Sequence, residues 1–287
     1  MANLRQIRSR ISSVKTIQQI TRAMKMVASA RLHRAQTQLL AARPYAQKMN
    51  EMVRNIAGRV RDTETPLLKP GKGTIPAFLV LTSDKGLCAG FNVSPLQAAG
   101  AAYAAAAPGQ KPEIMVAGRK GVGFFRRTEI KAYREWAGFW QDLNLTHADL
   151  IGQDVIEAYS SGRWSSLTLI YNRFKSRMSQ ELSRVTLLPV SLPSTWPDRP
   201  AGGYVFEPNA SEVLDYLLPR FVKNALWHAL LESKAAELAA RMQAMENATQ
   251  SAKDMIADMT LNLNRARQGA ITREISELVA GAEAINA

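Results

Sequence analysis

The sequence predicts a mixed α/β protein in which a long antiparallel coiled coil, made by the two ends of the chain, accompanies a small Rossmann-like middle domain. Apolar residues recur at heptad spacing near both ends. Between these ends, short apolar runs alternate with helical stretches, as in βαβ units. The boundaries that follow are 1–62 for the N-terminal coiled-coil helix, 63–208 for the middle domain and 209–287 for the C-terminal coiled-coil helix.

The first helix is expected from Leu4 to about Val60, a length of roughly 80 Å at 1.5 Å per residue. Before Ala28 the apolar residues Val14, Ile17 and Ile20 add an extra three-residue step, which predicts a stammer in the coiled coil. Pro44 lacks an amide donor and is expected to bend the helix. The regular seam consists of Ala28, Leu32, Ala35, Leu39, Ala42, Ala46, Met49, Val53, Ile56 and Val60.

The last helix is expected from about Ser211 to Ile285, roughly 110 Å. Near its C-terminus, after Ala270, the apolar seam of this helix shifts by one residue, to Ile271, Ile275 and Leu278. Because neither end of the chain has another partner in the sequence, the two helices are expected to pair with each other. A static structural coiled coil has the same pattern, so the pattern alone shows no moving role. The seam before the shift consists of Leu238, Met242, Met245, Thr249, Ala252, Ile256, Met259, Leu263, Ala266 and Ala270.

The middle domain reads as a small α/β domain with a mostly parallel sheet. Proline- and glycine-rich segments, 66–73 and 189–203, separate it from the two helices. The expected strands are 77–81, 114–117, 167–171 and 185–188, and the expected helices are 93–107, 120–127 and 150–159.

Composition limits the possible functions. The net charge is +13, and the first 50 residues hold ten Lys or Arg and no acid before Glu51. Such a segment favours a polyanion or an acidic protein surface. An acid-free, Arg-rich N-terminus is also typical of a transit peptide, but a transit peptide would not continue one seam for so long. The single cysteine, Cys88, excludes an internal disulfide framework and favours a reducing compartment.

Two further absences are expected from the sequence. No run of about 18 apolar residues occurs, so no membrane span is expected. No apolar segment follows Met1, so no secretory signal is expected.

No catalytic, cofactor or metal site is predicted. The segment 83–90 has the placement of a phosphate loop, but no Gly-Lys-Ser/Thr closes it. The glycines at 118, 121 and 123 have the wrong order for a dinucleotide fingerprint, so both segments are interpreted as tight turns beside strands. His33, His147 and His228 show no zinc spacing. His147 and Asp149 are interpreted as surface polar residues, because i,i+2 neighbours do not face each other on a helix.

Several stretches resemble the γ subunits of F-type ATP synthases. At the N-terminus these are Ile7-Arg8-Ser9-Arg10-Ile11 and Ile20-Thr21-Arg22-Ala23-Met24-Lys25-Met26-Val27-Ala28, and in the middle Ser83-Asp84-Lys85-Gly86-Leu87-Cys88-Ala89-Gly90-Phe91-Asn92. At the C-terminus they are Arg241-Met242-Gln243-Ala244-Met245, Ala248-Thr249 and Arg265-Ala266-Arg267-Gln268-Gly269-Ala270-Ile271-Thr272-Arg273-Glu274. Their order and spacing cover the whole chain.

The resemblance implies a rotating central stalk without catalytic residues of its own. In that family the coiled coil stands in the cavity of a hexamer of α and β subunits, and the α/β domain binds the ε subunit and the ring of c subunits. Rotation then presents different faces of the shaft to the catalytic β subunits, which changes their nucleotide affinities. The resemblance also implies a peripheral location on the cytoplasmic side of a bacterial inner membrane.

The resemblance also implies contact residues. Arg267, Gln268 and Thr272, with Arg241 and Glu274 as weaker candidates, match positions that contact β, and Met24 matches a position that faces an acidic loop of β. Lys25 follows Met24, so the local charge can differ from that of other members. The foot that faces the c ring and ε is assigned to Tyr204, Phe206, Glu207, Lys85 and Cys88.

Two other classes of protein remain open. A nucleic-acid-binding coiled coil would use the basic N-terminal helix, but that helix lacks a separate basic region and stacking aromatics. An α/β enzyme with helical extensions would bind a nucleotide in the middle domain. The resemblance to γ subunits is preferred over both classes, so the expected partners are α, β, ε and c subunits, with no nucleic acid.

Overall fold

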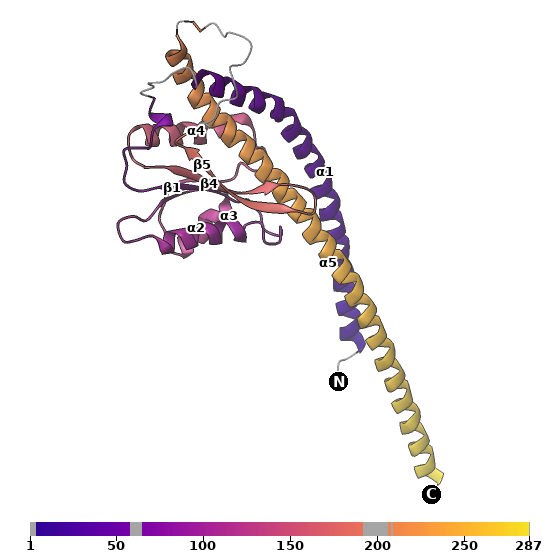
Figure 1. Cartoon of the computed structure of the whole chain (residues 1–287). Coiled ribbons are helices and arrows are strands. Elements are labelled where there is room, and N and C mark those ends of the chain that lie inside the picture. Colours follow the sequence, from indigo (N-terminus) through magenta and orange to yellow (C-terminus); the bar gives the residue numbers. More distant parts are fainter. Residues whose placement is uncertain (1–3, 58–64, 192–205, 208, 287) are drawn as a thin grey trace. The chain divides into compact units, whose positions relative to one another are not determined.

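The computed structural model describes residues 4–57, 65–191, 206–207 and 209–286, and the side chains among them up to residue 281 (Figure 1). Its contacts divide the chain into two units: residues 1–28 with 242–287, here called the shaft unit, and residues 29–241, here called the α/β unit. Two helices, α1 (Leu4–Ala57) and α5 (Ala210–Asn286), contribute to both units. The three-part division at 62 and 208 stays a prediction.

The shaft unit is an antiparallel helix pair. Lys25 of α1 contacts Glu246 of α5, and Thr21 contacts Thr249, so the numbering runs in opposite directions along the two helices. The predicted pairing of the two ends is therefore confirmed. Continuing this register places Ile11 opposite Met259, both of them apolar.

The predicted stammer in α1 is wrong. Ile17, Ile20 and Val27 are each 53% exposed, whereas Ile11 and Thr21 are buried. The inward positions are 11, 14, 18, 21, 25 and 28, which continue the heptad spacing of the later seam without an extra step. The regular seam of α1 therefore includes polar residues, whereas the apolar side chains of Ile17, Ile20, Met26 and Val27 face outward.

The seam predicted for α5 is confirmed up to Ala270, because all ten of its positions are buried or half-buried. The shifted positions are different: Ile271 is 47% exposed, Ile275 56% and Leu278 74%. By the register above, Leu4 lies level with about residue 266. The last turns of α5 therefore extend beyond the described part of α1, and no described residue covers their apolar side chains.

The α/β unit contains a five-stranded sheet of order β3-β2-β1-β4-β5. The first four strands are parallel and β5 is antiparallel to β4. This agrees with the mostly parallel sheet expected from the sequence. The strands are β1 (Ala77–Leu81), β2 (Glu113–Ala117), β3 (Ala132–Trp136), β4 (Leu167–Phe174) and β5 (Gln180–Leu188).

Helices cover both faces of the sheet (Figure 1). On one face lie α2 (Val93–Ala105) and α3 (Arg119–Arg127), which enclose a core around Val80, Val116 and Phe125. On the other face lie α4 (Leu145–Ser160) and the first part of α5. A short 3-10 helix, Pro66–Leu68, follows α1.

The larger core joins the sheet to both long helices. Buried residues of α5 from Leu214 to Leu231 pack with strand residues such as Leu79 and Leu169, and with Val53 and Ile56 of α1. The seam predicted for α1 from Ala28 to Ile56 is buried or half-buried throughout. Helix α1 continues through Pro44 without interruption. The first part of α5 is thus a core helix of the α/β unit.

Candidate partner-binding surfaces

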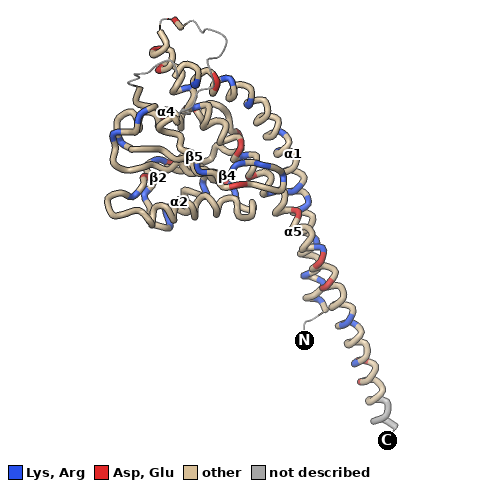
Figure 2. Tube along the Cα trace, viewed as in Figure 1, with Lys and Arg blue, Asp and Glu red and all other residues tan. Residues whose placement is uncertain are grey.

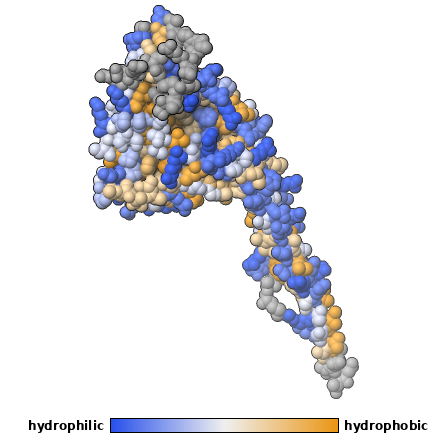
Figure 3. Space-filling model, viewed as in Figure 1, coloured by the Kyte–Doolittle hydropathy of each residue, from blue (hydrophilic) through white to orange (hydrophobic). Residues whose placement is uncertain are grey.

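The predicted contact residues near the end of α5 form one exposed helical stretch. Arg267, Gln268, Thr272 and Glu274 are all exposed. The Thr272 hydroxyl donates to the Gln268 carbonyl oxygen over 3.0 Å, a bond within the helix. Their side chains lie beside the exposed apolar residues of the same turns, and Figure 3 shows apolar surface along the last described turns of α5. The structure therefore brings four of the seven predicted β-contact residues together.

Met24 and Lys25 lie on α1, and both are half-buried. The Lys25 ammonium forms an ion pair of 2.6 Å with Glu246 across the seam. Next to them, Ile17, Ile20 and Val27 are exposed at the i, i+3 and i+10 positions of one helix face. In the shaft unit, α1 therefore combines an apolar outward stripe with basic side chains, and Figure 2 shows Lys and Arg distributed along α1.

Arg241 has a different environment from the other predicted contact residues. Its side chain is 14% exposed, and its guanidinium pairs with the Glu237 carboxylate one turn earlier on α5. A second nitrogen of the guanidinium donates to the Gly86 carbonyl oxygen over 2.7 Å. In this structure, Arg241 holds a loop of its own chain.

That loop joins β1 to α2 and contains the predicted foot residues Lys85 and Cys88. Lys85 is exposed. Cys88 is 2% exposed and packs against Ala236 and Ala240 of α5, so burial raises the pKa of its thiol. Of these two residues, only Lys85 presents its side chain to solvent.

The remaining foot residues precede α5. Phe206 is half-buried and packs against the larger core, whereas Glu207 is exposed. Tyr204 lies outside the described residues.

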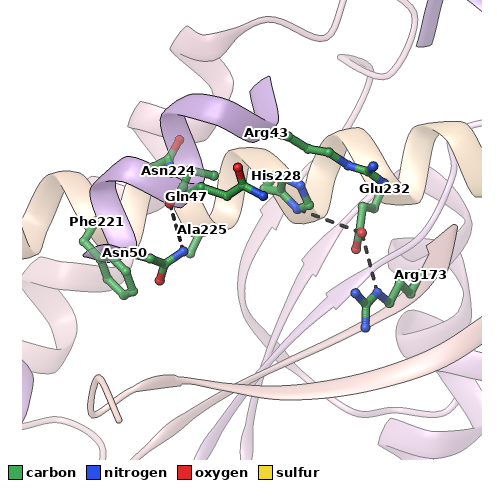
Figure 4. Close-up of a pocket in the computed structure, with 10 residues that line it drawn as sticks. Arg43, Gln47, Asn50, Arg173, Phe221, Asn224, Ala225, His228 and Glu232 are labelled. Carbon is green, nitrogen blue, oxygen red and sulfur yellow. Dashed lines mark hydrogen bonds and ion pairs between the residues drawn. The ribbon is translucent and has the colours of Figure 1, made fainter. Parts of the chain in front are cut away.

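The α/β unit also contains a polar pocket of about 430 Å³ between α1, β4 and α5 (Figure 4). Glu232 is one of its lining residues: its carboxylate accepts a hydrogen bond from the Tyr171 hydroxyl over 2.9 Å and lies 3.6 Å from Arg173 Nε. Burial, with the Glu232 charge, raises the pKa of Tyr171. The pocket is lined by Arg43, Ala46, Gln47, Asn50, Arg173, Phe221, Asn224, Ala225, His228 and Glu232.

The lining residues of this pocket do not form a catalytic arrangement. His228 Nδ1 lies 4.0 Å from Glu232, which is too long for a hydrogen bond. Burial lowers the pKa of His228, which favours the neutral imidazole. The lining contains no hydroxyl or thiol nucleophile. Among the described residues, no group of three or more His, Cys, Asp or Glu side chains is arranged to hold a metal ion.

His147 is more than the surface residue that the sequence suggested. It is half-buried, and its ring stacks on Phe139 with centroids 5.1 Å apart. Its Nδ1 accepts from the Asn144 backbone amide at 3.3 Å, while the Asn144 side chain accepts from the His147 amide at 3.4 Å. This reciprocal pair caps the N-terminus of α4. Asp149 is half-buried on the same helix.

Sequence reasoning missed the carboxylate of Asp84. It accepts hydrogen bonds from the backbone amides of Arg119 at 2.9 Å, Gly138 at 3.1 Å and Trp140 at 3.3 Å. These donors are 35, 54 and 56 residues away, so no local pattern could reveal them. The only available signal was position, because Asp84 follows a buried strand of a parallel sheet, where neighbouring loops converge.

Comparisons with known proteins agree over the full length of the chain. The family described as ATP synthase matches residues 3–285. The chain is similar to an "ATP synthase gamma chain" of Desulfitobacterium hafniense, with 41% identity over 99% of this chain and 100% of the relative. It is similar to the protein of that name from Chlorobaculum parvum, with 40% identity over 99% of each.

Solved structures show the same fold. The central stalk and c-ring structure of the Tetrahymena thermophila mitochondrial ATP synthase matches with a TM-score of 0.59 and 26% identity, over 80% of this chain and 99% of that one. A chain of the Euglena gracilis mitochondrial ATP synthase matches with a TM-score of 0.69 and 18% identity, over 98% of this chain and 94% of that one. None of the helices, over the residues that the structure describes, is long and apolar enough to cross a membrane.

Proposed function

Since the chain belongs to the ATP synthase gamma-chain family, we propose that it is the rotating central stalk of a proton-translocating F-type ATP synthase, which couples rotation of a c ring to the conformational cycle of catalytic β subunits. In this proposal the chain itself is not catalytic. Its partners are an α/β hexamer, an ε subunit and a c ring, and it binds no nucleic acid.

The observation that best supports the proposal is the uncovered end of α5. Ile271, Ile275 and Leu278 are exposed on turns that extend beyond the described part of α1. Exposed apolar side chains at this density favour burial against another protein. An apolar sleeve inside a hexamer would cover them, and Arg267 and Gln268 on the same turns would supply polar contacts.

Asymmetry is the second requirement of a rotor. A shaft must present different surfaces to three identical catalytic subunits, because only differential contact can change their relative affinities. In the shaft unit, α1 faces outward with Ile17, Ile20 and basic side chains, whereas the end of α5 faces outward without α1 beside it. At the level of Ile17 and Ile20, α5 exposes the polar residues Gln250, Lys253 and Asp254, so the two sides of the helix pair differ in chemistry.

The location follows from the partners. A chain held by a c ring lies at the membrane surface without crossing the bilayer, and we place it on the cytoplasmic side of an inner membrane. The ten basic residues among the first fifty also suit an acidic loop on a partner subunit. Electrostatic complementarity of this kind acts mainly on association rate and specificity.

Co-expression tests the proposal. The tagged chain is produced with the α and β subunits of the same organism, and the purified complex is assayed for ATP hydrolysis. We expect a stable complex of the chain with the hexamer that hydrolyses ATP and rotates. The proposal would be overturned if the chain is recovered alone, or if it is recovered in a complex with nucleic acid that survives high salt.

A matched pair of double variants locates the contact. R267A/Q268A removes one cation and one amide from the end of α5, and Q110A/K111A removes one amide and one cation, here an ammonium, from an exposed segment of the α/β unit. We expect the first variant to lower the hydrolysis rate of the complex while β still binds nucleotide, and the second to behave as wild type. Equal behaviour of the two variants would remove these residues from the proposed contact.

A further inference from the structure

We propose that the loop 83–92 is a torque joint that fixes helix α5 to the α/β unit, and that the hydrogen bond from Arg241 to the Gly86 carbonyl is its outermost contact. This inference rests on the proposed rotor function and adds to it the residues that carry torque from the foot into the shaft. Arg241 is the last residue of the α/β unit, and α5 continues from it without interruption.

The loop is firmly attached to the sheet side of the unit. Asp84 accepts three backbone hydrogen bonds, from the start of α3 and from the segment between β3 and α4. A carboxylate with several amide donors is among the stronger hydrogen-bonded groups in proteins, especially at a helix N-terminus. At the end of β1, the Thr82 hydroxyl accepts from the Gly121 amide at 3.0 Å. Asp84 and Thr82 therefore hold the start of the loop in place.

The loop is also braced internally. The Asn92 side chain accepts from the Ser83 amide at 2.8 Å and donates to the Ser83 hydroxyl at 2.9 Å, which ties the two ends of the loop together. Leu87 and Ala89 have φ values of 64° and 48°, which non-glycine residues rarely adopt. Such backbone conformations persist only where the surrounding contacts hold them in place, as expected of a rigid connector.

The other side of the loop grips α5. Cys88 and Phe91 pack against Ala236 and Ala240, one helical turn apart on α5. The small alanine side chains allow the loop backbone to approach the helix closely. Asn172 of β4 donates to the Phe91 carbonyl oxygen over 2.6 Å, so this contact is also fixed to the sheet.

Glu237 orients the outermost contact. Its carboxylate accepts from Arg241 Nε at 2.9 Å and holds the planar guanidinium so that another nitrogen reaches Gly86 at 2.7 Å. Burial raises the pKa of Glu237, while Arg241 favours its charged form. Removing either side chain therefore leaves the other without its main partner.

The position of the loop along α5 gives it mechanical importance. The larger core holds α5 by residues from Leu214 to Leu231. Beyond Leu231, α5 is packed against α1, because the register of the helix pair places Leu238 opposite Leu32 and both are buried. The loop adds contacts at 236, 240 and 241, which tie this part of α5 to the sheet as well. Without the loop, α1 alone would support α5 here, and the joint would be softer.

Thermal fluctuations in the angle of the rotor, within the assembled complex, measure the torsional stiffness of this joint. The α/β hexamer is fixed to a surface, and a bead is attached through a biotinylated peptide inserted at the exposed Gly109 turn of the α/β unit. The angular variance of the bead during the ATP-waiting pause reports torsional compliance. We expect R241A to raise the variance about twofold, because packed contacts and hydrogen bonds carry such coupling. R241K is expected to lie between R241A and wild type, because Lys can reach Gly86 but lacks the planar fork.

A disulfide between the loop and α5 should restore the stiffness that R241A removes. Cys88 is the only cysteine of the chain, so in an A240C variant an intramolecular disulfide can join only residues 88 and 240. In the R241A/A240C chain, oxidation is expected to return the variance to the wild-type value, and reduction to raise it again. The exposed A257C serves as a control that should not respond.

The outcomes separate the inference from the proposed function. If the wild-type chain does not assemble or rotate, the rotor function fails. If it rotates but R241A, R241K and reduced or oxidised A240C all show the wild-type variance, the joint is overturned and the function stands. If R241A does not fold, the comparison of oxidised and reduced A240C in an otherwise wild-type chain decides the question.

Discussion

The Thr249 hydroxyl of α5 lies 2.8 Å from the Thr21 hydroxyl oxygen of α1, inside the helix seam of the shaft unit. Thr21 is 8% exposed, and its own hydroxyl donates to the Gln18 carbonyl oxygen at 3.0 Å. The Thr21 oxygen is therefore available to accept from Thr249, whose single proton has the Met245 carbonyl oxygen at 2.7 Å as its alternative acceptor. A polar pair in the seam costs stability but favours one register, because a slip would break the contact between the two hydroxyl groups.

The first prediction concerns this pair. T249V should lower the free energy of unfolding by about 0.5–1.5 kcal/mol, because it removes the donor to a buried oxygen. T21V/T249V should recover most of that loss, because two apolar side chains then meet. The measurement is urea denaturation followed by circular dichroism at 222 nm. A coupling energy near zero in the double-mutant cycle would show that the two hydroxyl groups do not interact.

Thr260 provides the matched control for this cycle. Its hydroxyl donates to the Ile256 carbonyl oxygen one turn earlier in α5, the acceptor that Met245 offers to Thr249, but Thr260 is exposed and has no partner hydroxyl on α1 within the described residues. T260V is expected to change the stability by less than about 0.5 kcal/mol.

The shaft helices show what heptad reasoning can and cannot predict. The seam from Ala28 onward and the α5 seam were predictable, because apolar residues occupy consecutive seam positions. Before Ala28, Ile17 and Ile20 suggested a stammer, but the inward positions are Gln18, which is half-buried, and Thr21, which is buried. From a sequence pattern alone, apolar residues that face the partner helix cannot be distinguished from apolar residues that are exposed on the surface. Here regular helix geometry decided the register.

The strands of the middle domain were predictable where they are buried on both faces. The missed strand, β3, has the sequence Ala-Tyr-Arg-Glu-Trp and lies at the sheet edge, where polar side chains are tolerated. The first half of β5, the other edge strand, was missed for the same reason. The bonds from Asp84 and Arg241 were unpredictable, because they join segments up to 155 residues apart.

The second prediction compares two glycines with opposite expected effects. Gly118 has a φ of 118°, and an added Cβ would lie 2.2 Å from the Thr82 carbonyl oxygen. Gly123 lies within α3, and an added Cβ would have no neighbour within 4 Å. G118A should therefore destabilise the chain by more than about 2 kcal/mol, whereas G123A should stabilise it by about 0.5–1 kcal/mol. Urea denaturation of both variants checks the signs, and a shared sign would contradict the local geometry.

The third prediction is a pH dependence at Glu113. Its carboxylate accepts two hydrogen bonds from Arg163 and one from Trp164 Nε1, each 2.7 Å long. The Arg163 bonds lower the pKa of Glu113 from its ordinary value of 4.5. A carboxyl with a lowered pKa in the folded state contributes stability above its unfolded pKa and loses it as the pH falls through the folded pKa.

E113Q should therefore be less stable than wild type at pH 7, because it loses the charged carboxylate that accepts two bonds from Arg163. The expected loss in the free energy of unfolding is only about 1–2 kcal/mol, since Arg163 is partly exposed to solvent. The difference should shrink below about pH 4. Urea denaturation from pH 3 to pH 7 measures it. The control is E51Q, which breaks the exposed pair of Glu51 with Lys48 and should change little at any pH. A constant difference for E113Q across this range would refute the linkage.

The last prediction separates assembly from folding at the end of α5. I271Q/I275Q/L278Q replaces three exposed apolar side chains with polar ones of good helix propensity. The urea midpoint of the isolated chain should stay at the wild-type value, because these side chains are already in water. Binding to the α/β hexamer should weaken by about tenfold or more, since each buried apolar side chain contributes about 1 kcal/mol or more.

The control replaces three equally exposed apolar residues of the α/β unit, as L145Q/L150Q/M178Q. Both triple variants lose the same kind of surface, so only location differs between them. Titration of each chain into the hexamer, with ATP hydrolysis as the readout, measures the two affinities. If both variants bind as wild type does, the uncovered turns of α5 do not enter the hexamer, and the apolar surface there must serve another partner. If only the α5 variant weakens, the turns that extend beyond α1 are the part of the shaft that the hexamer covers.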